Sequence, residues 1–183
     1  MGDDARRILA VLVDFGDTLS DQASEERDAD GLMTGVALID GARELLLALR
    51  ERGLPVALVA DGEVDESRIL RVRHGLEELF AAVVISEAVG ASKPDPRPFR
   101  AALDALRIAP ADYGRVVMLG NRLERDVRGA NALGLISVWL DWAPRYRKFP
   151  VGPGEAPQHV IRAPLELLDV LDRLEAETRA DRP

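Results

Sequence analysis

Four short polar stretches, at residues 14–19, 60–62, 92–96 and 120–126, hold the residue types that could do chemistry. Three of them directly follow an apolar run, and the fourth lies a few residues beyond one. Together they carry carboxylates, an amide and a lysine, which suit Mg²⁺ and an anionic substrate. A single polar residue after a strand is usually a turn or a helix cap, and a lone lysine is usually solvated. The conjunction of all four stretches is what predicts a site.

The elements that must position these residues alternate along the chain. Unbroken apolar runs at 8–13, 55–60, 81–85, 116–119 and 136–140 are typical of strands buried on both faces. Helical patterns lie between and after them, at 38–49, 68–80 (with a break near Gly75), 96–106, 123–133 and 164–174. The alternation predicts an α/β, doubly wound, three-layer Rossmann-like fold with a mainly parallel five-stranded sheet. Ligands of such sheets bind beyond the carboxyl ends of the strands, where the four polar stretches would meet.

Two segments do not fit this alternation of strands and helices. Residues 20–35 are polar and acidic with no clear core face, and residues 145–157 are rich in Pro and Gly, which is typical of an irregular surface loop. The sequence contains no repeat and no internal boundary, so we expect one domain over residues 1–183.

Composition excludes several function classes. The net charge of −8 and the 4% aromatic content argue against nucleic acid as the main partner. The absence of cysteine excludes disulfides, thiolate metal sites and cysteine nucleophiles. No apolar run reaches the roughly 20 residues that span a bilayer, and the first residues lack the apolar segment of a signal peptide. We therefore expect a cytoplasmic protein with no membrane association.

The motifs around these residues resemble those of the haloacid dehalogenase (HAD) superfamily. VLVDFGDTL is similar to the first motif, DxDGT[LV], and IDGARELLLALRERG is similar to the helix before the second motif. SKPDPRPF resembles the third motif, and LGNRLERDVRGANALG resembles the fourth. The resemblance covers nearly the whole chain in the family's order. A receiver domain also has an acid cluster and a lysine, but its phosphoacceptor and lysine follow other strands.

The resemblance implies a chemistry for particular residues. Asp14 matches the aspartate that attacks phosphorus and forms an aspartyl-phosphate. Lys93 matches the lysine that stabilises the transferring phosphoryl group. The Mg²⁺ ligands of the family would correspond to Asp14, the backbone carbonyl of Gly16, and Asn121 and Asp126 of the fourth motif. Phosphorylated small molecules or larger phosphorylated substrates are the implied partners.

Three positions depart from the family pattern. Gly16 replaces the aspartate that acts as general acid and base, a contribution of roughly 10²–10⁴-fold. Ala60 replaces a Ser or Thr that binds phosphate, which leaves the backbone N–H groups of Asp61 and Gly62 as donors. Asn121 replaces an aspartate and would ligate Mg²⁺ with less charge. Substrates with good leaving groups, such as acyl phosphates, would tolerate the loss of the acid.

Neighbouring residues do not restore the missing groups. Thr18 keeps its usual offset from Asp14, so Asp17 occupies the usual glycine position and is expected to be structural. Arg122 stands beside the fourth motif, where it is either a substrate contact or a solvated charge. Trp142 and Arg145 could edge the cleft.

The lengths of the segments between the motifs limit the size of any cap domain over the site. Residues 20–40 allow little more than a flap, and residues 60–93 only a helix and a strand, so we expect no substantial cap domain and an open site. Capless relatives often assemble, so the resemblance also allows a homodimer.

Two main hypotheses follow: a Mg²⁺-dependent phosphohydrolase acting through Asp14, or a catalytically impaired protein that binds a phosphorylated ligand or a protein partner. Another reaction on the same fold, such as dehalogenation, is a third.

Overall fold

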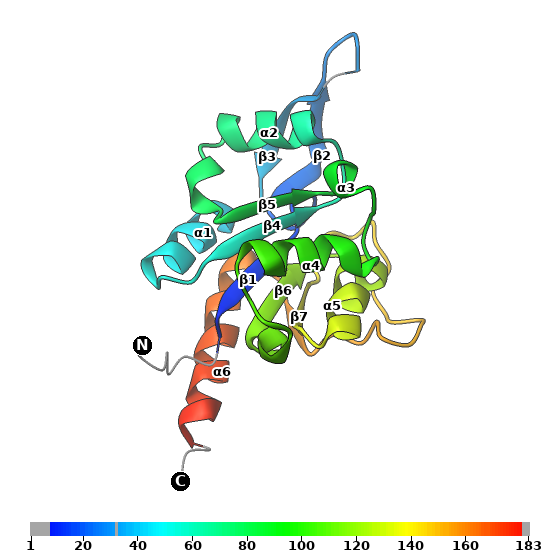
Figure 1. Cartoon of the computed structure of the whole chain (residues 1–183). Helices are drawn as coiled ribbons and strands as arrows, with labels where there is room; N and C mark the ends of the chain where they lie inside the picture. The colour runs from blue at the N-terminus through cyan, green and yellow to red at the C-terminus, as the bar shows by residue number, and fades with distance from the viewer. Residues whose placement is uncertain (1–7, 32, 181–183) are drawn as a thin grey trace.

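A six-stranded parallel sheet forms the centre of the molecule (Figure 1), as seen in a computed structural model that describes residues 8–31 and 33–180. The strand order β5-β4-β1-β6-β7-β8 places the first strand in the middle. The sheet consists of β1 (Ala10–Val13), β4 (Val56–Ala60), β5 (Ala82–Ile85), β6 (Val116–Gly120), β7 (Ile136–Leu140) and β8 (His159–Ile161).

Helices cover both faces of this sheet and make the fold three-layered (Figure 1). One face packs against α1 (Ala42–Glu51), α2 (Val64–Arg73) and α6 (Leu167–Ala180), and the other against α4 (Pro96–Ala105) and α5 (Arg128–Leu133). In β1, Val11 and Val13 belong to the first core and Ala10 and Leu12 to the second. Because successive strand residues point to opposite faces, a fully apolar strand is what a sheet covered on both sides requires. The predicted doubly wound α/β fold is confirmed.

The expected helices are present with adjusted ends. The break near Gly75 separates α2 from a 3₁₀ turn (Glu77–Leu79), and Gly75 itself has a positive φ of 61°. α4 begins at Pro96, with Asp95 as its N-cap accepting a hydrogen bond from the backbone N–H of Arg97 at 2.9 Å. The shorter helical elements are α3 (Ser86–Val89), the 3₁₀ turns Pro110–Arg115 and Pro164–Glu166, and the π-helical turn Leu123–Val127.

The expected count of five strands is wrong by one, because β8 joins the edge of the sheet beside β7. This strand has three residues, and only Ile161 is buried, while Val160 is 52% exposed. Such a short, half-exposed segment gives no apolar run. Residues 145–157 contain no strand and no helix, as expected for an irregular loop.

The polar segment after β1 folds as an antiparallel hairpin of β2 (Ser20–Arg27) and β3 (Met33–Leu38), separate from the main sheet. Met33 and Val36 of β3, together with Leu19 just before β2, join the first core, while half of the β2 residues are exposed and one is buried. Between β4 and Lys93 the structure describes only α2, the turn 77–79, β5 and α3. Among the described residues, no helix is long and apolar enough to cross a membrane.

Candidate active site

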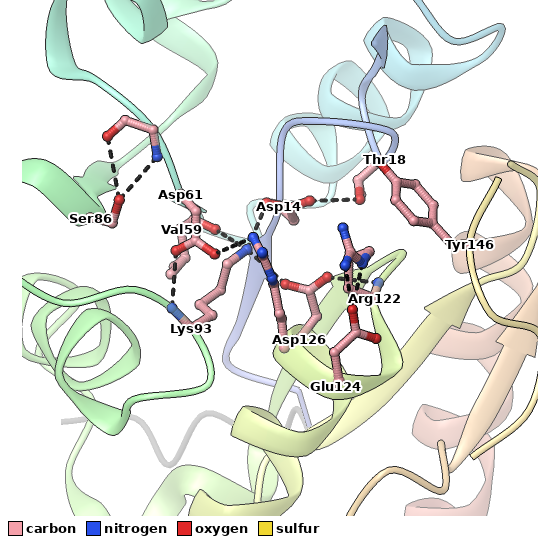
Figure 2. Close-up of polar contacts among 12 residues, drawn as sticks. Asp14, Thr18, Val59, Asp61, Ser86, Lys93, Arg122, Glu124, Asp126 and Tyr146 are labelled. Atoms are coloured by element: carbon pink, nitrogen blue, oxygen red, sulfur yellow. Dashed lines mark hydrogen bonds and ion pairs between the residues drawn. The ribbon is translucent and has the colours of Figure 1, made fainter. Parts of the chain in front are cut away.

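The candidate residues meet at the carboxyl end of the sheet (Figure 2). β4, β1 and β6 are neighbours, so the residues that follow them, Asp61, Asp14 and Asn121, come to one edge. Lys93 reaches the same place from the loop between α3 and α4. These residues line one cleft, which the β2–β3 hairpin and α2 also border. The sequence-predicted meeting of the four polar stretches is therefore observed.

Lys93 is the centre of the cluster. Its Nζ lies 2.6 Å from Asp14 Oδ1 and 2.7 Å from Asp126 Oδ1, and it donates to the carbonyl oxygen of Val59 at 2.9 Å. The side chain is 2% exposed, and its ammonium group makes hydrogen bonds to Asp14 and Val59 and an ion pair with Asp126. Burial acts to lower the pKa of Lys93, but the charges of Asp126 and Asp14 outweigh burial and raise it. Lys93 is therefore a fixed positive charge.

Asp14 is held from both sides. Its Oδ1 faces Lys93, and its Oδ2 accepts a hydrogen bond from the Thr18 hydroxyl at 3.1 Å. Thr18 is fully buried, and Asp14 is 7% exposed where it borders the cleft. Two fixed partners orient the carboxylate, which is the arrangement a nucleophile needs before it attacks.

Asp126 lies in the π-helical turn and pairs with the same lysine as Asp14. It is 1% exposed, and its Oδ2 accepts a hydrogen bond from the backbone N–H of Arg122 at 2.9 Å. Burial, together with the charge of Asp14, raises the pKa of Asp126 to about 6, although Lys93 opposes the shift. A Cβ at position 120 would lie 2.4 Å from the Asp126 side chain. Gly120 is therefore what allows this carboxylate to approach the strand end.

Asn121 carries an unsatisfied amide. The residue is 3% exposed, yet neither Oδ1 nor Nδ2 has a hydrogen-bond partner among the described residues. Its backbone carbonyl accepts from Trp139 Nε1 at 3.0 Å, which fixes the residue in place. A buried amide without partners is costly, and its carbonyl oxygen is a good ligand for a hard cation.

The donor set in the cleft fits Mg²⁺. Asp14 and Asp126 supply carboxylate oxygens, and Asn121 Oδ1 and the backbone carbonyl of Gly16 supply neutral ones. In the described part of the chain, no cluster of three or more His, Cys, Asp and Glu residues forms a metal site. A magnesium ion in this cleft would therefore be held by an amide oxygen and a main-chain oxygen as well as by two carboxylates.

Asp17 occupies a different environment from Asp14. Its side chain is fully buried, and its φ of 55° is one that Asp adopts more readily than most residues. Its carboxylate accepts from Arg145 Nε at 3.0 Å, from the Tyr146 hydroxyl at 2.6 Å and from the backbone N–H of Gln22 at 3.0 Å. Asp17 thus ties the loop after β7 to the loop after β1, which is the structural role expected from its position.

We expect Asp17→Asn to lower the free energy of unfolding by about 2 kcal/mol, because it leaves the Arg145 guanidinium with a weaker partner. Urea denaturation followed by circular dichroism measures this change. Asp21→Asn is the matched control: Asp21 also pairs with Arg145, at 3.3 Å, but is a third exposed, so its loss should cost less than about 1 kcal/mol. Equal costs for the two variants would contradict the assignment.

Four more predicted residues line the cleft: Ala60, Asp61, Gly62 and Arg122. Trp142 and Arg145, expected at its edge, do not line it and instead contact Asp17. Ala60 lines the cleft through a small apolar side chain. Asp61 Oδ1 accepts from the backbone N–H of Lys93 at 3.0 Å, and the backbone N–H of Gly62 donates to Ser86 Oγ at 3.0 Å. Arg122 pairs with Glu124 and stacks over the Tyr146 ring at 4.3 Å. Asp61 therefore positions the lysine loop, and Arg122 stands at the rim of the cleft.

Two cleft residues, Gln22 and Tyr146, do not follow from the motifs. Gln22 lies on the exposed hairpin strand β2, and Tyr146 lies in the irregular loop after β7. No sequence signal joins them, because they are 124 residues apart, but the Tyr146 hydroxyl lies 3.1 Å from Gln22 Oε1.

Comparison with known proteins gives the chain its family. A family model for haloacid dehalogenase-like hydrolases matches residues 6–134. The chain is 43% identical to a phosphoserine phosphatase of Thermus thermophilus over 100 residues, 55% of this chain and 39% of that protein. It is 33% identical to a glyceraldehyde 3-phosphate phosphatase of Pyrococcus furiosus over 135 residues, 74% of this chain and 55% of that protein. The chain thus spans about half the length of these curated relatives, or less.

A solved structure supports the same family assignment. The structure of YfnB from Bacillus subtilis, bound to magnesium, matches with a TM-score of 0.64 and 26% identity, over 74% of this chain and 57% of that one. The motifs, the topology and these matches point to the same conclusion: the chain belongs to the haloacid dehalogenase-like hydrolase family.

Proposed function

We propose that this chain is a Mg²⁺-dependent phosphohydrolase that works through an aspartyl-phosphate on Asp14. The observation that carries the proposal is the buried cluster of Asp14, Lys93 and Asp126 beside the unsatisfied amide of Asn121. A charged lysine between two carboxylates, facing an open cleft, is suited to a dianionic phosphoryl group and its counter-ion. The phosphatase names of the two curated relatives support this reaction class.

The chain's own residues have separate tasks in the reaction. Thr18 and Lys93 orient the Asp14 carboxylate so that one oxygen attacks phosphorus in line with the leaving group. Lys93 also stabilises the charge on the transferring group, because it is fixed and shielded from water. When bound, Mg²⁺ would be held by Asp14, Asp126, Asn121 and the Gly16 carbonyl, and would neutralise phosphoryl charge. Water then cleaves the aspartyl-phosphate and restores Asp14.

The leaving group decides which substrates react. Gly16 supplies no proton, so the leaving oxygen must depart as an anion. Acyl phosphates and aryl phosphates meet this condition better than alkyl phosphates. We therefore propose phosphorylated small molecules, or larger phosphorylated substrates that an open cleft admits, with a preference for good leaving groups.

The test is phosphate release from acetyl phosphate, p-nitrophenyl phosphate and an alkyl phosphate. We expect kcat/KM, which reports transfer to Asp14 and not the later hydrolysis, to fall in that order by about tenfold or more at each step. Phosphate release should require Mg²⁺, so that a chelator abolishes it and added Mg²⁺ restores it. Release equal to that of the Asp14→Asn protein on every substrate would contradict the proposal. That result would favour the second hypothesis, a protein that only binds a phosphorylated ligand or a partner.

A further inference from the structure

The space above Gly16 is not empty. A Cβ built on Gly16 would lie 2.7 Å from Gln22 Nε2 and 2.8 Å from Gln22 Cδ, closer than real Cβ atoms pack. The carboxamide of Gln22 therefore occupies the place where a side chain at position 16 would begin. Gly16 and Gln22 both line the cleft that holds Asp14 and Lys93.

Gln22 is held in this place at both ends. Its backbone N–H donates to Asp17 Oδ1 at 3.0 Å, and its Oε1 lies 3.1 Å from the Tyr146 hydroxyl. That hydroxyl also lies 2.6 Å from Asp17 Oδ2, so its single proton is shared between two acceptors. Arg122 stacks on the Tyr146 ring and limits its movement. An exposed hairpin residue is thus tied to the fully buried Asp17.

The orientation of the carboxamide sets its chemistry. Because Oε1 faces Tyr146, Nε2 is the atom nearest the Gly16 position. The nitrogen carries two N–H donors and no titratable proton. Burial and the Asp17 carboxylate raise the pKa of Tyr146, so the phenol that anchors Oε1 stays protonated at neutral pH.

We propose that the Gln22 carboxamide donates a hydrogen bond to the leaving-group oxygen during phosphoryl transfer. This inference rests on the proposed function. An Asp14 oxygen forms the new bond to phosphorus, the bond from phosphorus to the leaving oxygen breaks, and the electron pair stays on that oxygen. Gln22 stabilises the negative charge that develops there and keeps its own proton, and solvent protonates the released group. A neutral donor thus stands where an acid would otherwise act.

This role has a consequence that a merely structural role lacks. The hydrogen bond strengthens as more charge gathers on the leaving oxygen, so Gln22 should matter most for poor leaving groups. Gln22→Met keeps the length of the side chain and removes the donor. We expect kcat/KM to fall about tenfold for an alkyl phosphate and about twofold for acetyl phosphate. Across a series of aryl phosphates, the dependence of rate on leaving-group pKa should become steeper.

Ala23→Met is the matched control, because Ala23 is the next residue on the same exposed strand and does not line the cleft. It should leave both the rates and the slope unchanged. A second arm uses Gly16→Asp, whose Cβ would lie closest to the Gln22 carboxamide and would displace it. If both groups serve the same oxygen, Gln22→Met should cost much less in the Gly16→Asp background than in the wild type.

The outcomes separate the inference from the function on which it rests. A steeper slope for Gln22→Met and a smaller effect in the Gly16→Asp background support the contact. An equal loss on every substrate, or no loss, overturns the role of Gln22 while an inactive Asp14→Asn protein still supports the phosphohydrolase. An Asp14→Asn protein as active as the wild type overturns both.

Discussion

The Asp14→Asn protein is expected to release phosphate from acetyl phosphate at the background rate, at least about 10³-fold below the wild type. An amide of the same size lacks the charged oxygen that attacks phosphorus. Lys93 would keep its ion pair with Asp126 and its hydrogen bond to the Val59 carbonyl, so the variant should remain folded. Initial rates of phosphate release with Mg²⁺ measure the loss, and circular dichroism reports the fold.

Asp172→Asn is the matched control for this variant. Asp172 pairs with Arg52 on the surface, where its side chain is 63% exposed, and it lies outside the cleft. The same chemical change there should alter the rate by less than about twofold and stability by less than about 1 kcal/mol. Rates that are equal in wild type, Asp14→Asn and Asp172→Asn would remove Asp14 from the mechanism.

The second large effect is expected from Lys93→Met, which should lower phosphate release by about 10³-fold. It should also reduce the free energy of unfolding by about 3–5 kcal/mol without metal, because Asp14 and Asp126 would face each other without a counter-charge. Mg²⁺ should restore part of that stability by replacing the missing positive charge. Thermal unfolding with Mg²⁺ and with a chelator measures both parts.

The chain provides its own control for this change, because it has only one other lysine, Lys148. Lys148 pairs with Asp141 at 2.5 Å but is 38% exposed. Lys148→Met should cost less than about 1 kcal/mol and leave the rate unchanged. A Lys93→Met protein that is as stable and as active as Lys148→Met would contradict the buried cluster.

Much of the fold could be predicted from the sequence because burial leaves a pattern. Strands that are covered on both faces become unbroken apolar runs, as in β1 and β4, and each carboxyl end then locates a polar stretch. The edge strand β8 could not be predicted because two of its three residues are not buried, so it leaves no apolar run in the sequence. The β2–β3 hairpin could not be predicted because only one residue of β2 is buried, so its sequence shows no apolar alternation.

The site could be predicted only where its residues belong to the four polar stretches beyond the strands. Asp14, Lys93, Asn121 and Asp126 follow from the motifs, and their meeting follows from the parallel sheet. The contacts of Asp17 with Arg145 and Tyr146 join loops 128 and 129 residues apart, and the placement of Gln22 over Gly16 depends on a hairpin register. Such long-range contacts depend on packing, which leaves no local spacing in the sequence.

The most direct test of the central claim is to trap the phosphoryl group on Asp14. The protein would be mixed with acetyl phosphate and Mg²⁺, quenched in acid, reduced with borohydride and mapped by peptide mass spectrometry. Position 16 offers no base to activate water, so hydrolysis of the intermediate should be slow and the adduct should accumulate. We expect the reduced residue at Asp14, and none in the Asp14→Asn protein. Continued phosphate release with no modification at Asp14, or with modification at another residue, would contradict the account.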